Sequence, residues 1–430
     1  MNQDIERNNV NASVKRRTLF LFTKHYPYGK QEKYLDHEMP FLSPAFDRIM
    51  IIPFEYFGDG ESEIWSALPA NAEILNLNAL VKKEGVRASS VLWQAIGIWL
   101  YEFFHNKYRR FQLRHFKKNR NILLYQLICS RVLEKKLKEF NGDELFFYSY
   151  WFHHSALLLA AMKSRGVIRK FVSRAHSIDL YNENWLYADD VNKPLPFICY
   201  KMKYVDHIVP ISRHGRDFMS IRFPEYKAKI GQAYLGVSEN KESVFNDRSP
   251  FVIVSCSMFS DNKRVYLIPE ILSQLDFPIK WVHFGEGGDN PQRVMKSAES
   301  LPANVEVEWK GFTPNEKILR YYAEEHVNIF INLSRAEGVP VAIMEAISFG
   351  IPVVATAVYG TVELGTKDSA FFIPVEFSIK EVAKMLKTFA DDSVLQMRMR
   401  KAAYKHFQET VNAPLVYGQF IREYFRTESN

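Results

Sequence analysis

Two glutamates stand in one segment that is otherwise poor in charge. They are Glu337 and Glu345, with seven residues between them, in the run Ser334-Arg-Ala-Glu-Gly-Val-Pro-Val-Ala-Ile-Met-Glu-Ala-Ile-Ser-Phe-Gly350. Glu345 is the only charged residue from Gly338 to Gly360, and a carboxylate in such an apolar setting is costly unless strong donors reach it. Two neighbouring hydroxyls, such as those of a ribose, would satisfy both of its oxygens. The alternative to ligand binding is that Glu345 is buried in an ion pair with a structural Arg.

The same segment has the pattern of a strand, a loop and a helix. An apolar run ends at Ser334, a turn follows, and a helix is predicted from Val341. Amides at the start of a helix bind phosphates, so the turn predicts a phosphate site beside the hydroxyl-binding Glu337. An ordinary solvated loop glutamate is the alternative for Glu337. The residues predicted to bind this ligand are Gly338, Val339, Pro340 and Val341.

A second strand-to-helix junction, with its helix predicted over Arg264–Gln274, could supply a cation to the same phosphates. The run Ser255-Cys-Ser-Met-Phe-Ser-Asp-Asn-Lys-Arg264 places Lys263 there, and Arg264 could join it if its side chain turns toward the ligand. A solvated Arg at a helix start is the alternative for Arg264. Gly285 would let a ligand approach the backbone and Phe312 could stack on a base, although a glycine-rich strand end is often only a turn.

These residues resemble the donor-site signature of glycosyltransferase family 4. The resemblance rests on Glu337-Gly-Val-Pro-Val-Ala-Ile-Met-Glu345-Ala, on Gly350-Ile-Pro-Val-Val-Ala-Thr356 and on Gly360-Thr-Val-Glu363, within roughly Phe251 to Pro374. It implies a GT-B fold, a retaining reaction that needs no metal or other cofactor, and a UDP- or GDP-sugar as donor. It also implies that the two glutamates bind the donor sugar and the ribose.

The sequence departs from the family pattern at two positions. Tyr359 stands where the family usually has the first Gly of a Gly-Gly pair, and Met258 stands where it usually has an Arg for the diphosphate. We therefore expect a changed backbone or pocket near Tyr359 and a diphosphate clamp that depends on Lys263.

The amino-terminal half contributes a second group of candidates. The run Ser173-Arg-Ala-His-Ser-Ile-Asp-Leu-Tyr181 ends an apolar strand, and doubly wound sheets bind ligands at that edge. By the resemblance, His176 would contact the donor sugar near the reacting carbon, with a structural His as the alternative. Arg174, Asp179 and Tyr181 are predicted on the acceptor side.

The loop after the first strand is a further candidate. It contains Gly29, which would allow a close approach to the donor phosphates. Because no Walker Lys-Ser/Thr pair follows Gly29, ATP hydrolysis through a P-loop is disfavoured.

Alternating short apolar runs and helical patterns must position these residues. The pattern predicts an α/β protein with two Rossmann-like domains, each a doubly wound parallel sheet, facing a cleft. The domains are predicted at 1–240 and 241–410, with a helical insertion at about 81–140 and a final helix at 411–430 that could return to the first domain. The predicted strands are Thr18–Thr23, Arg48–Phe54, Leu145–Trp151, Lys170–His176, His207–Ser212, Phe251–Ser257, Lys280–Gly285, Val305–Lys310, Val327–Leu333 and Pro352–Val358.

Composition limits the partners and the location. The net charge of +7 favours acidic partners, and the three cysteines lie far apart, without the spacing of a zinc site or a disulfide framework. Val91–Phe104 is too short to cross a bilayer, and Met1–Arg17 lacks the apolar core of a secretory signal. We expect a cytoplasmic protein, with no metal site. The basic and aromatic run Lys107–Arg120 suits an anionic membrane surface, with a solvated charged helix as the alternative.

Together these features predict a retaining glycosyltransferase that moves a sugar from a nucleotide-diphosphate donor to a glycan or a lipid-linked glycan. A role in bacterial surface polysaccharide synthesis, at the inner face of the membrane, follows from the resemblance. Two alternatives remain open: a sugar-nucleotide epimerase on the same fold, and a catalytically silent protein that binds a sugar nucleotide or RNA. Nucleic acid is not an expected partner, and the sequence leaves the oligomeric state open.

Overall fold

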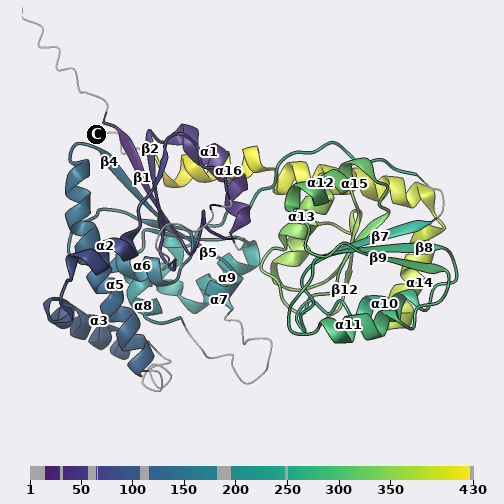
Figure 1. The fold of residues 1–430 in the computed structure, drawn as a ribbon, viewed down its shortest axis with the longest axis horizontal. Helices are drawn as coiled ribbons and strands as arrows, with labels where there is room; N and C mark the ends of the chain where they lie inside the picture. The colour runs from purple at the N-terminus through teal and green to yellow at the C-terminus, as the bar shows by residue number, and fades with distance from the viewer. Residues whose placement is uncertain are drawn as a thin grey trace, which may run out of the picture.

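The computed structural model describes residues 15–29, 32–56, 64, 66–106, 116–181, 195–246 and 250–426. Two parallel β-sheets dominate this part of the chain, and they form two lobes side by side (Figure 1). Residues 107–115 of the basic and aromatic run lie outside the described residues.

The first sheet has six strands in the order β3-β2-β1-β4-β5-β6, all parallel. Four of these strands, β1, β2, β5 and β6, are buried along most of their length because helices cover both faces, which explains why they are apolar runs rather than alternating patterns. The strands are β1 (Arg17–Thr23), β2 (Arg48–Pro53), β3 (Ala72–Ile74), β4 (Glu144–Ser149), β5 (Val172–Ala175) and β6 (His207–Pro210).

The helices around the first sheet include a group that lies between β3 and β4 in the chain. This group, α2, α3 and α5, forms the side of the first lobe that is far from the second lobe (Figure 1). The helices are α1 (Met39–Leu42), α2 (Leu77–Glu84), α3 (Leu92–His105), α5 (Phe116–Leu137), α6 (His154–Ser164), α7 (Ser177–Leu180), α8 (Ile198–Tyr204) and α9 (Arg213–Arg222).

The second sheet repeats the same kind of topology, with six parallel strands in the order β12-β11-β10-β7-β8-β9. Its strands are β7 (Phe251–Cys256), β8 (Ile279–Phe284), β9 (Val305–Trp309), β10 (Ile329–Asn332), β11 (Val353–Thr356) and β12 (Ala370–Ile373). The helices on its two faces are α10 (Leu267–Leu272), α11 (Pro291–Ala298), α12 (Asn315–Glu324), α13 (Val341–Ser348), α14 (Ile379–Ala390) and α15 (Ser393–Thr410).

The prediction of two doubly wound parallel sheets is confirmed, and two edge strands were missed. These are β3 and β12, which have only three and four residues. Both strands are only partly buried, so neither has the fully buried apolar run that marks the central strands. One helix start was also wrong: α10 begins at Leu267 instead of Arg264, because Arg264 has a φ of 50° and a residue in this left-handed region cannot continue an α-helix.

The chain passes between the lobes at two adjacent points. Val237 pairs with Asn412 in a parallel bridge, and the amide of Ala413 donates to the Val237 carbonyl at 3.0 Å. The helix that follows, α16 (Ala413–Tyr424), returns to the first lobe and lies over α1 (Figure 1). There the side chain of Arg17 donates to the Phe425 carbonyl at 2.6 Å.

Candidate functional site

Loops at the carboxyl ends of both sheets meet where the lobes contact each other. A Cβ atom built on Gly338, after β10, would lie 3.1 Å from the Cβ of Ser177 in the first lobe. One built on Gly360, after β11, would lie 2.9 Å from the Cβ of Ser212. The predicted donor segment and the predicted strand-end segment of the first lobe are therefore neighbours, although more than a hundred residues separate them.

The structure brings together Lys263, which was predicted as a cation for the phosphates, and Glu337, which was predicted to bind sugar hydroxyls. The Lys263 ammonium forms an ion pair with Glu337, and the Ser334 hydroxyl donates to the same carboxylate oxygen at 2.7 Å. Both charged side chains keep part of their surface open to solvent. A ligand that arrives there meets a cation and an acceptor of hydroxyl protons at one point.

Asn262 holds this pair in place, and sequence reasoning missed it. Its side-chain amide donates to the Ala336 carbonyl and its side-chain oxygen accepts from the Ala336 amide, both at 3.0 Å. The Arg335 amide donates to the Asn262 carbonyl at 2.8 Å. These bonds fix the loop after β7 against the loop after β10. The partners are 74 residues apart, so no local pattern could reveal them.

Glu345 lies on α13 and is buried, as the sequence predicted. Its hydrogen-bond donor among the described residues is the side-chain amide of Asn315, at 2.7 Å from Oε1, and not a structural Arg. Burial raises the pKa of Glu345 to about 7, and the bond from Asn315 opposes this rise only in part. The protein thus holds a carboxylate that is short of donors, which is the condition for binding ligand hydroxyls.

The start of α13 lies between the two glutamates in the chain. Pro340 precedes the first helical residue, Val341, and no side chain caps this end of the helix. The first amides of α13 can therefore serve a phosphate. Val339 is itself buried, so Gly338 and Val339 would contribute through their backbone.

The remaining donor-side candidates differ in their exposure and in their backbone conformation. Phe312 is half exposed after Gly311, as stacking on a base would need. Gly285 has a φ of 123°, and a Cβ there would lie 2.1 Å from the Ser257 carbonyl oxygen, so close packing of the chain explains this glycine. Gly29, in the first lobe, is exposed with a φ of 71°.

Arg264 does not face the ligand, which corrects its assignment to donor binding. Its side chain is buried, and it donates to the carbonyls of Leu333 and Val375 at 2.7 and 2.8 Å. Since Met258 is exposed and uncharged, Lys263 is the cation of this loop that lies beside Glu337.

His176 sits at the first-lobe edge in a cluster of aromatic rings. Its ring centroid lies 4.3 Å from that of Trp151 and 4.9 Å from that of Tyr150, and its Nε2 donates to the Tyr150 carbonyl at 3.0 Å. Burial, together with the nearby charge of Arg174, lowers the pKa of His176 to about 3. The imidazole is therefore neutral at physiological pH, with its proton on the Nε2 that bonds the Tyr150 carbonyl.

Two acceptor-side predictions in the first lobe are wrong. Arg174 is fully buried: its guanidinium donates to the Tyr148 hydroxyl at 2.7 Å and lies 3.4 Å from Glu38, so it belongs to the core. Asp179 is also buried, and its carboxylate accepts from the His176 amide at 3.0 Å. Burial raises the pKa of Asp179 to about 6. Both residues support the strand end, and neither faces an acceptor.

Glu32 organises the loop after β1, a role that sequence reasoning missed. Its carboxylate accepts from the amides of Lys24, His25 and Tyr26 at 3.1, 2.6 and 2.7 Å. It also accepts from the Trp151 indole at 2.6 Å, which ties this loop to the aromatic cluster around His176.

Tyr181 and Tyr359 join the two lobes beside this edge. Their rings are stacked with centroids 4.6 Å apart, and the Tyr181 hydroxyl lies 2.6 Å from Nδ1 of His214. Tyr359 has a φ of 38°, a left-handed value that favours glycine. The Tyr359 side chain, at the position where the resemblance led us to expect glycine, thus packs against Tyr181.

Glu363, at the end of the sequence motif, clamps the lobes together. Its carboxylate accepts from the amides of Arg213 and His214, each at 2.8 Å, and from the Tyr234 hydroxyl at 2.6 Å. These amides open α9, so a residue of the second lobe caps a helix of the first. The sequence motif included Glu363, but the sequence alone did not show that Glu363 would bind the start of α9.

Comparisons with known proteins agree with this arrangement. Residues 237–406 match the family described as Glycosyl transferases group 1. The putative colanic acid biosynthesis glycosyltransferase WcaL of Escherichia coli K12 is 25% identical over 321 residues, which are 70% of this chain and 75% of that protein. The amylovoran biosynthesis glycosyltransferase AmsK of Erwinia amylovora is 29% identical over 113 residues, 25% of this chain and 28% of that protein. This protein is a glycosyltransferase.

Solved structures show the fold of this glycosyltransferase over nearly its whole length. Anabaena Alr3699/HepE, solved in complex with UDP, superposes with a TM-score of 0.61 at 14% identity, covering 94% of this chain and 98% of that one. Staphylococcal TarM gives a TM-score of 0.65 at 13% identity, covering 96% and 99%. The two-domain α/β architecture is therefore the GT-B fold, as predicted.

One group of side chains in the glycosyltransferase could hold a metal ion. Glu55, His153 and His154 each offer a ligand atom, and these atoms lie within 4.8 Å of one another. Both imidazoles reach the same Glu55 oxygen at 3.3 Å, which by itself accounts for the cluster. Spacing could not have revealed it, because Glu55 and His153 are 98 residues apart.

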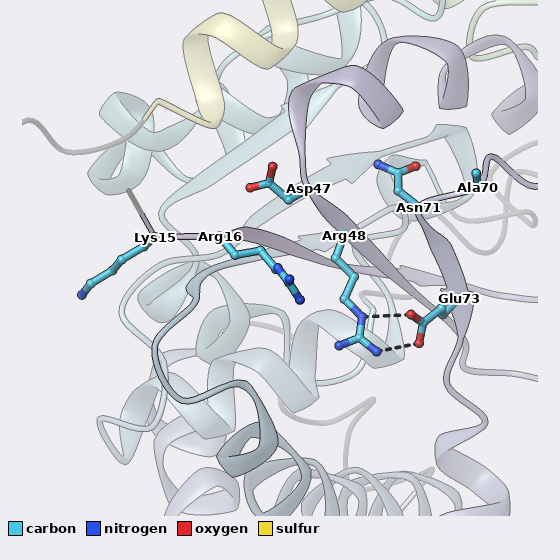
Figure 2. Close-up of a pocket in the computed structure, with 7 residues that line it drawn as sticks. All are labelled: Lys15, Arg16, Asp47, Arg48, Ala70, Asn71 and Glu73. Carbon is cyan, nitrogen blue, oxygen red and sulfur yellow. Dashed lines mark hydrogen bonds and ion pairs between the residues drawn. The ribbon is translucent and has the colours of Figure 1, made fainter. Parts of the chain in front are cut away.

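A polar pocket of the glycosyltransferase lies away from the site (Figure 2). Arg48 and Glu73 face each other in it, joined by a two-pronged ion pair at 3.1 and 2.6 Å. This pocket is at the amino ends of β1 and β2, the opposite edge from the candidate site. Its lining residues are Lys15, Arg16, Asp47, Arg48, Ala70, Asn71 and Glu73.

None of the described helices of the glycosyltransferase has both the length and the apolar character that a membrane crossing needs.

Proposed function

We propose that this glycosyltransferase is a retaining, metal-independent hexosyltransferase that takes its sugar from a UDP- or GDP-sugar. The observation that carries the proposal is the grouping of Lys263, Glu337 and the buried Glu345 around the uncapped start of α13. This grouping offers a cation and amides to a diphosphate and carboxylates to hydroxyls on either side of it. Solved relatives of this fold in complex with UDP and UDP-glucose support the choice of donor.

The donor is proposed to lie along α13. Its ribose would bind Glu345, whose carboxylate has one side-chain donor, Asn315, and would gain two hydroxyl donors. The diphosphate would meet the first amides of α13 and Lys263, and the sugar hydroxyls would meet Glu337. Phe312 is placed to stack on the base.

Transfer then proceeds by positioning and by stabilisation of the leaving group. The bond between the anomeric carbon and the diphosphate oxygen breaks, and Lys263 with the helix amides stabilises the negative charge that the diphosphate gains. The acceptor hydroxyl attacks from the same face, and its proton passes to the leaving diphosphate oxygen, so the configuration is retained. Neutral His176 would hydrogen-bond to the sugar without exchanging a proton.

The acceptor is proposed to be a glycan or a lipid-linked glycan of a bacterial surface polysaccharide, reached at the inner face of the cell membrane. The named roles of the relatives, colanic acid and amylovoran biosynthesis, support this acceptor class. They do not favour an epimerase or a silent binding protein, because each of these relatives is named as a transferase.

Nuclear magnetic resonance of the sugar released from a bound donor tests the proposed chemistry. UDP-, GDP- and ADP-glucose would be incubated with the protein, with and without EDTA, and the anomer that appears first would be recorded before it mutarotates. We expect the α-anomer of glucose from one donor at a rate that EDTA leaves unchanged. The β-anomer first would contradict retention, and loss of release in EDTA would contradict metal independence.

A further inference from the structure

Helix α3 carries an apolar stripe that faces solvent. Trp93 is 82% exposed and Phe104 is 71% exposed, and three more apolar side chains on the helix are exposed between or beside them. From Trp93 to Phe104 their spacing of three or four residues places them on one side of the helix, and Leu92 precedes Trp93 directly. We call this surface the α3 ridge, and it consists of Leu92, Trp93, Ile96, Leu100 and Phe104, with Phe116 at the start of α5.

The opposite side of α3 is firmly attached to the first lobe. Ala95 and Ile98 are buried in the core, and Glu102 is buried among hydrogen bonds: its carboxylate accepts from the Tyr200 amide at 3.0 Å and from the Asn106 side chain at 2.6 Å. Folding the ridge inward would expose these groups. The ridge is therefore a permanent outer surface, at the end of the lobe far from the second lobe (Figure 1).

A contiguous apolar surface of this kind marks an interaction site, whereas single exposed apolar residues are normal on monomers. Elsewhere in the described chain, Ile221 and Val394 are about as exposed as Trp93, but neither belongs to a comparable stripe. These two residues provide matched controls below.

The charged residues next to the ridge in the chain are mainly basic. Lys117, Lys118 and Arg120 are exposed directly after Phe116, and the Phe116 ring lies 5.0 Å from that of Trp99 on α3. Before the ridge, Lys82, Lys83 and Arg87 are exposed, while the carboxylate of Glu84 is paired with Lys135. We call these exposed basic residues the basic rim; an apolar stripe that they flank in the chain fits a surface that is apolar inside and anionic outside.

We propose that the α3 ridge docks this protein onto a lipid bilayer with anionic headgroups. Trp93 and Phe104 would enter the boundary between headgroups and acyl chains, where aromatic side chains are favoured, and the basic rim would bind lipid phosphates. A second copy of the chain fits less well, because pairing two ridges would bring two basic rims together. This inference deepens the proposed function. The link between docking and a lipid-linked acceptor rests on that proposed function, whereas docking itself needs no donor.

Sedimentation with lipid vesicles tests the docking. The full chain would be mixed with vesicles of phosphatidylcholine alone or with added phosphatidylglycerol. We expect binding to the anionic vesicles that weakens with salt. Trp93→Ser with Phe104→Ser should lower the partition coefficient at least about tenfold, since each apolar side chain that leaves the bilayer forfeits its burial. The control pair Ile221→Ser and Val394→Ser should bind like wild type.

A charge reversal tests the rim separately. Lys117→Glu with Lys118→Glu should weaken binding to anionic vesicles by about twentyfold or more, because each lysine near such a surface contributes roughly fivefold. Lys401→Glu with Lys405→Glu changes the net charge equally on exposed lysines of α15, so this control should lose much less. If the two double variants lost vesicle binding equally, the basic residues beside the ridge would not be the contact with the membrane.

Two further outcomes would overturn the docking. One is vesicle binding that the ridge variants leave unchanged. The other is sedimentation velocity that shows a dimer in wild type and a monomer in Trp93→Ser with Phe104→Ser, without vesicle binding by either. Thermal stabilisation by a nucleotide sugar should persist in the ridge variants, so failure of docking and failure of the donor site are distinguishable.

Discussion

At the scale of single residues, the site contains a buried carboxylate, Glu345, that has few hydrogen-bond donors. Glu345 is buried with Asn315 as its side-chain donor, so the folded protein binds a proton there more tightly than the unfolded chain does. A group whose folded pKa lies above its unfolded pKa favours folding when protonated. In the ligand-free protein, this contribution is present at low pH and is lost as pH rises from about 4.5 to about 7.

Glu345→Gln should show this loss directly. Gln does not titrate, so the free energy of unfolding of the variant minus that of wild type should rise by about 3 kcal/mol between pH 4 and pH 8. Urea unfolding at a series of pH values measures it. Glu376→Gln, at a side chain that is 89% exposed, is the control and should give a flat difference. A flat difference for Glu345→Gln as well would mean that Glu345 has an ordinary pKa.

Lys263→Met tests the cation of the diphosphate site. Because Lys263 would stabilise charge that develops only as the donor bond breaks, kcat for donor cleavage should fall by about a hundredfold to a thousandfold. Lys296→Met removes an exposed lysine from α11 and should leave kcat unchanged. A Lys263→Met enzyme with wild-type kcat would require another residue to bear the leaving-group charge.

The sequence motif predicted where Glu337 and Glu345 lie relative to α13, but a strand end alone was a poor guide to the direction of a side chain. The position of Glu345 in an uncharged helix was enough to predict its burial. Arg174 was misassigned because a strand end does not reveal which way a side chain points, and this one points into the core against Glu38. Asn262 was missed because its bonds join two loops that only the fold brings together. Glu32 accepts from amides six to eight residues before it, a spacing that matches no standard helix cap, and from the distant Trp151.

At the scale of elements, α9 depends on a carboxylate from the other lobe. Glu363 binds two amides at the start of α9, where the helix dipole also favours a negative charge. Ser212 supplies the local side-chain cap of this helix: its hydroxyl oxygen accepts from the Gly215 amide at 2.9 Å. The two caps serve different amides, so one does not replace the other.

Glu363→Ala should therefore destabilise the protein. We expect the free energy of unfolding to fall by about 2–3 kcal/mol, since buried donors lose a charged partner. Denaturant unfolding measures the loss. Glu376→Ala, at an exposed loop carboxylate, should change it by less than about 0.5 kcal/mol. An equally small effect of Glu363→Ala would show that the interlobe cap contributes little.

The element boundaries that sequence missed also have physical causes. The edge strands β3 and β12 are only partly buried, and α10 starts late because the backbone at Arg264 is left-handed. The central strands were found because burial on both faces makes them continuous apolar runs. Tyr359 was flagged as a departure, and its positive φ shows that the backbone keeps a conformation that favours glycine while the ring packs on Tyr181.

At the scale of the whole molecule, the lobes are joined by two chain segments in close contact. Gly236 packs so tightly that a Cβ there would lie 2.6 Å from the Cα of Ala413, and the Tyr417 hydroxyl donates to the Gly236 carbonyl at 3.1 Å. Such a contact leaves no room for a methyl group unless one backbone moves.

Gly236→Ala should lower the melting temperature and the free energy of unfolding, the latter by about 1–3 kcal/mol, because the crossing must open to admit the methyl group. Differential scanning calorimetry measures the change. Gly97→Ala is the control: Gly97 lies inside α3 with nothing near its missing Cβ, so alanine should stabilise the helix slightly. A neutral Gly236→Ala would show that the crossing is free to shift.

The central claim is that Glu345 and its neighbours bind a nucleotide-diphosphate sugar, and donor binding tests it most directly. Melting temperatures of wild type and Glu345→Ala would be compared across UDP-, GDP- and ADP-sugars, since a ligand that binds only the native state raises its melting temperature. We predict that one donor stabilises wild type and that this stabilisation is lost in Glu345→Ala. Stabilisation of both proteins alike, or of neither by any donor, would contradict the site.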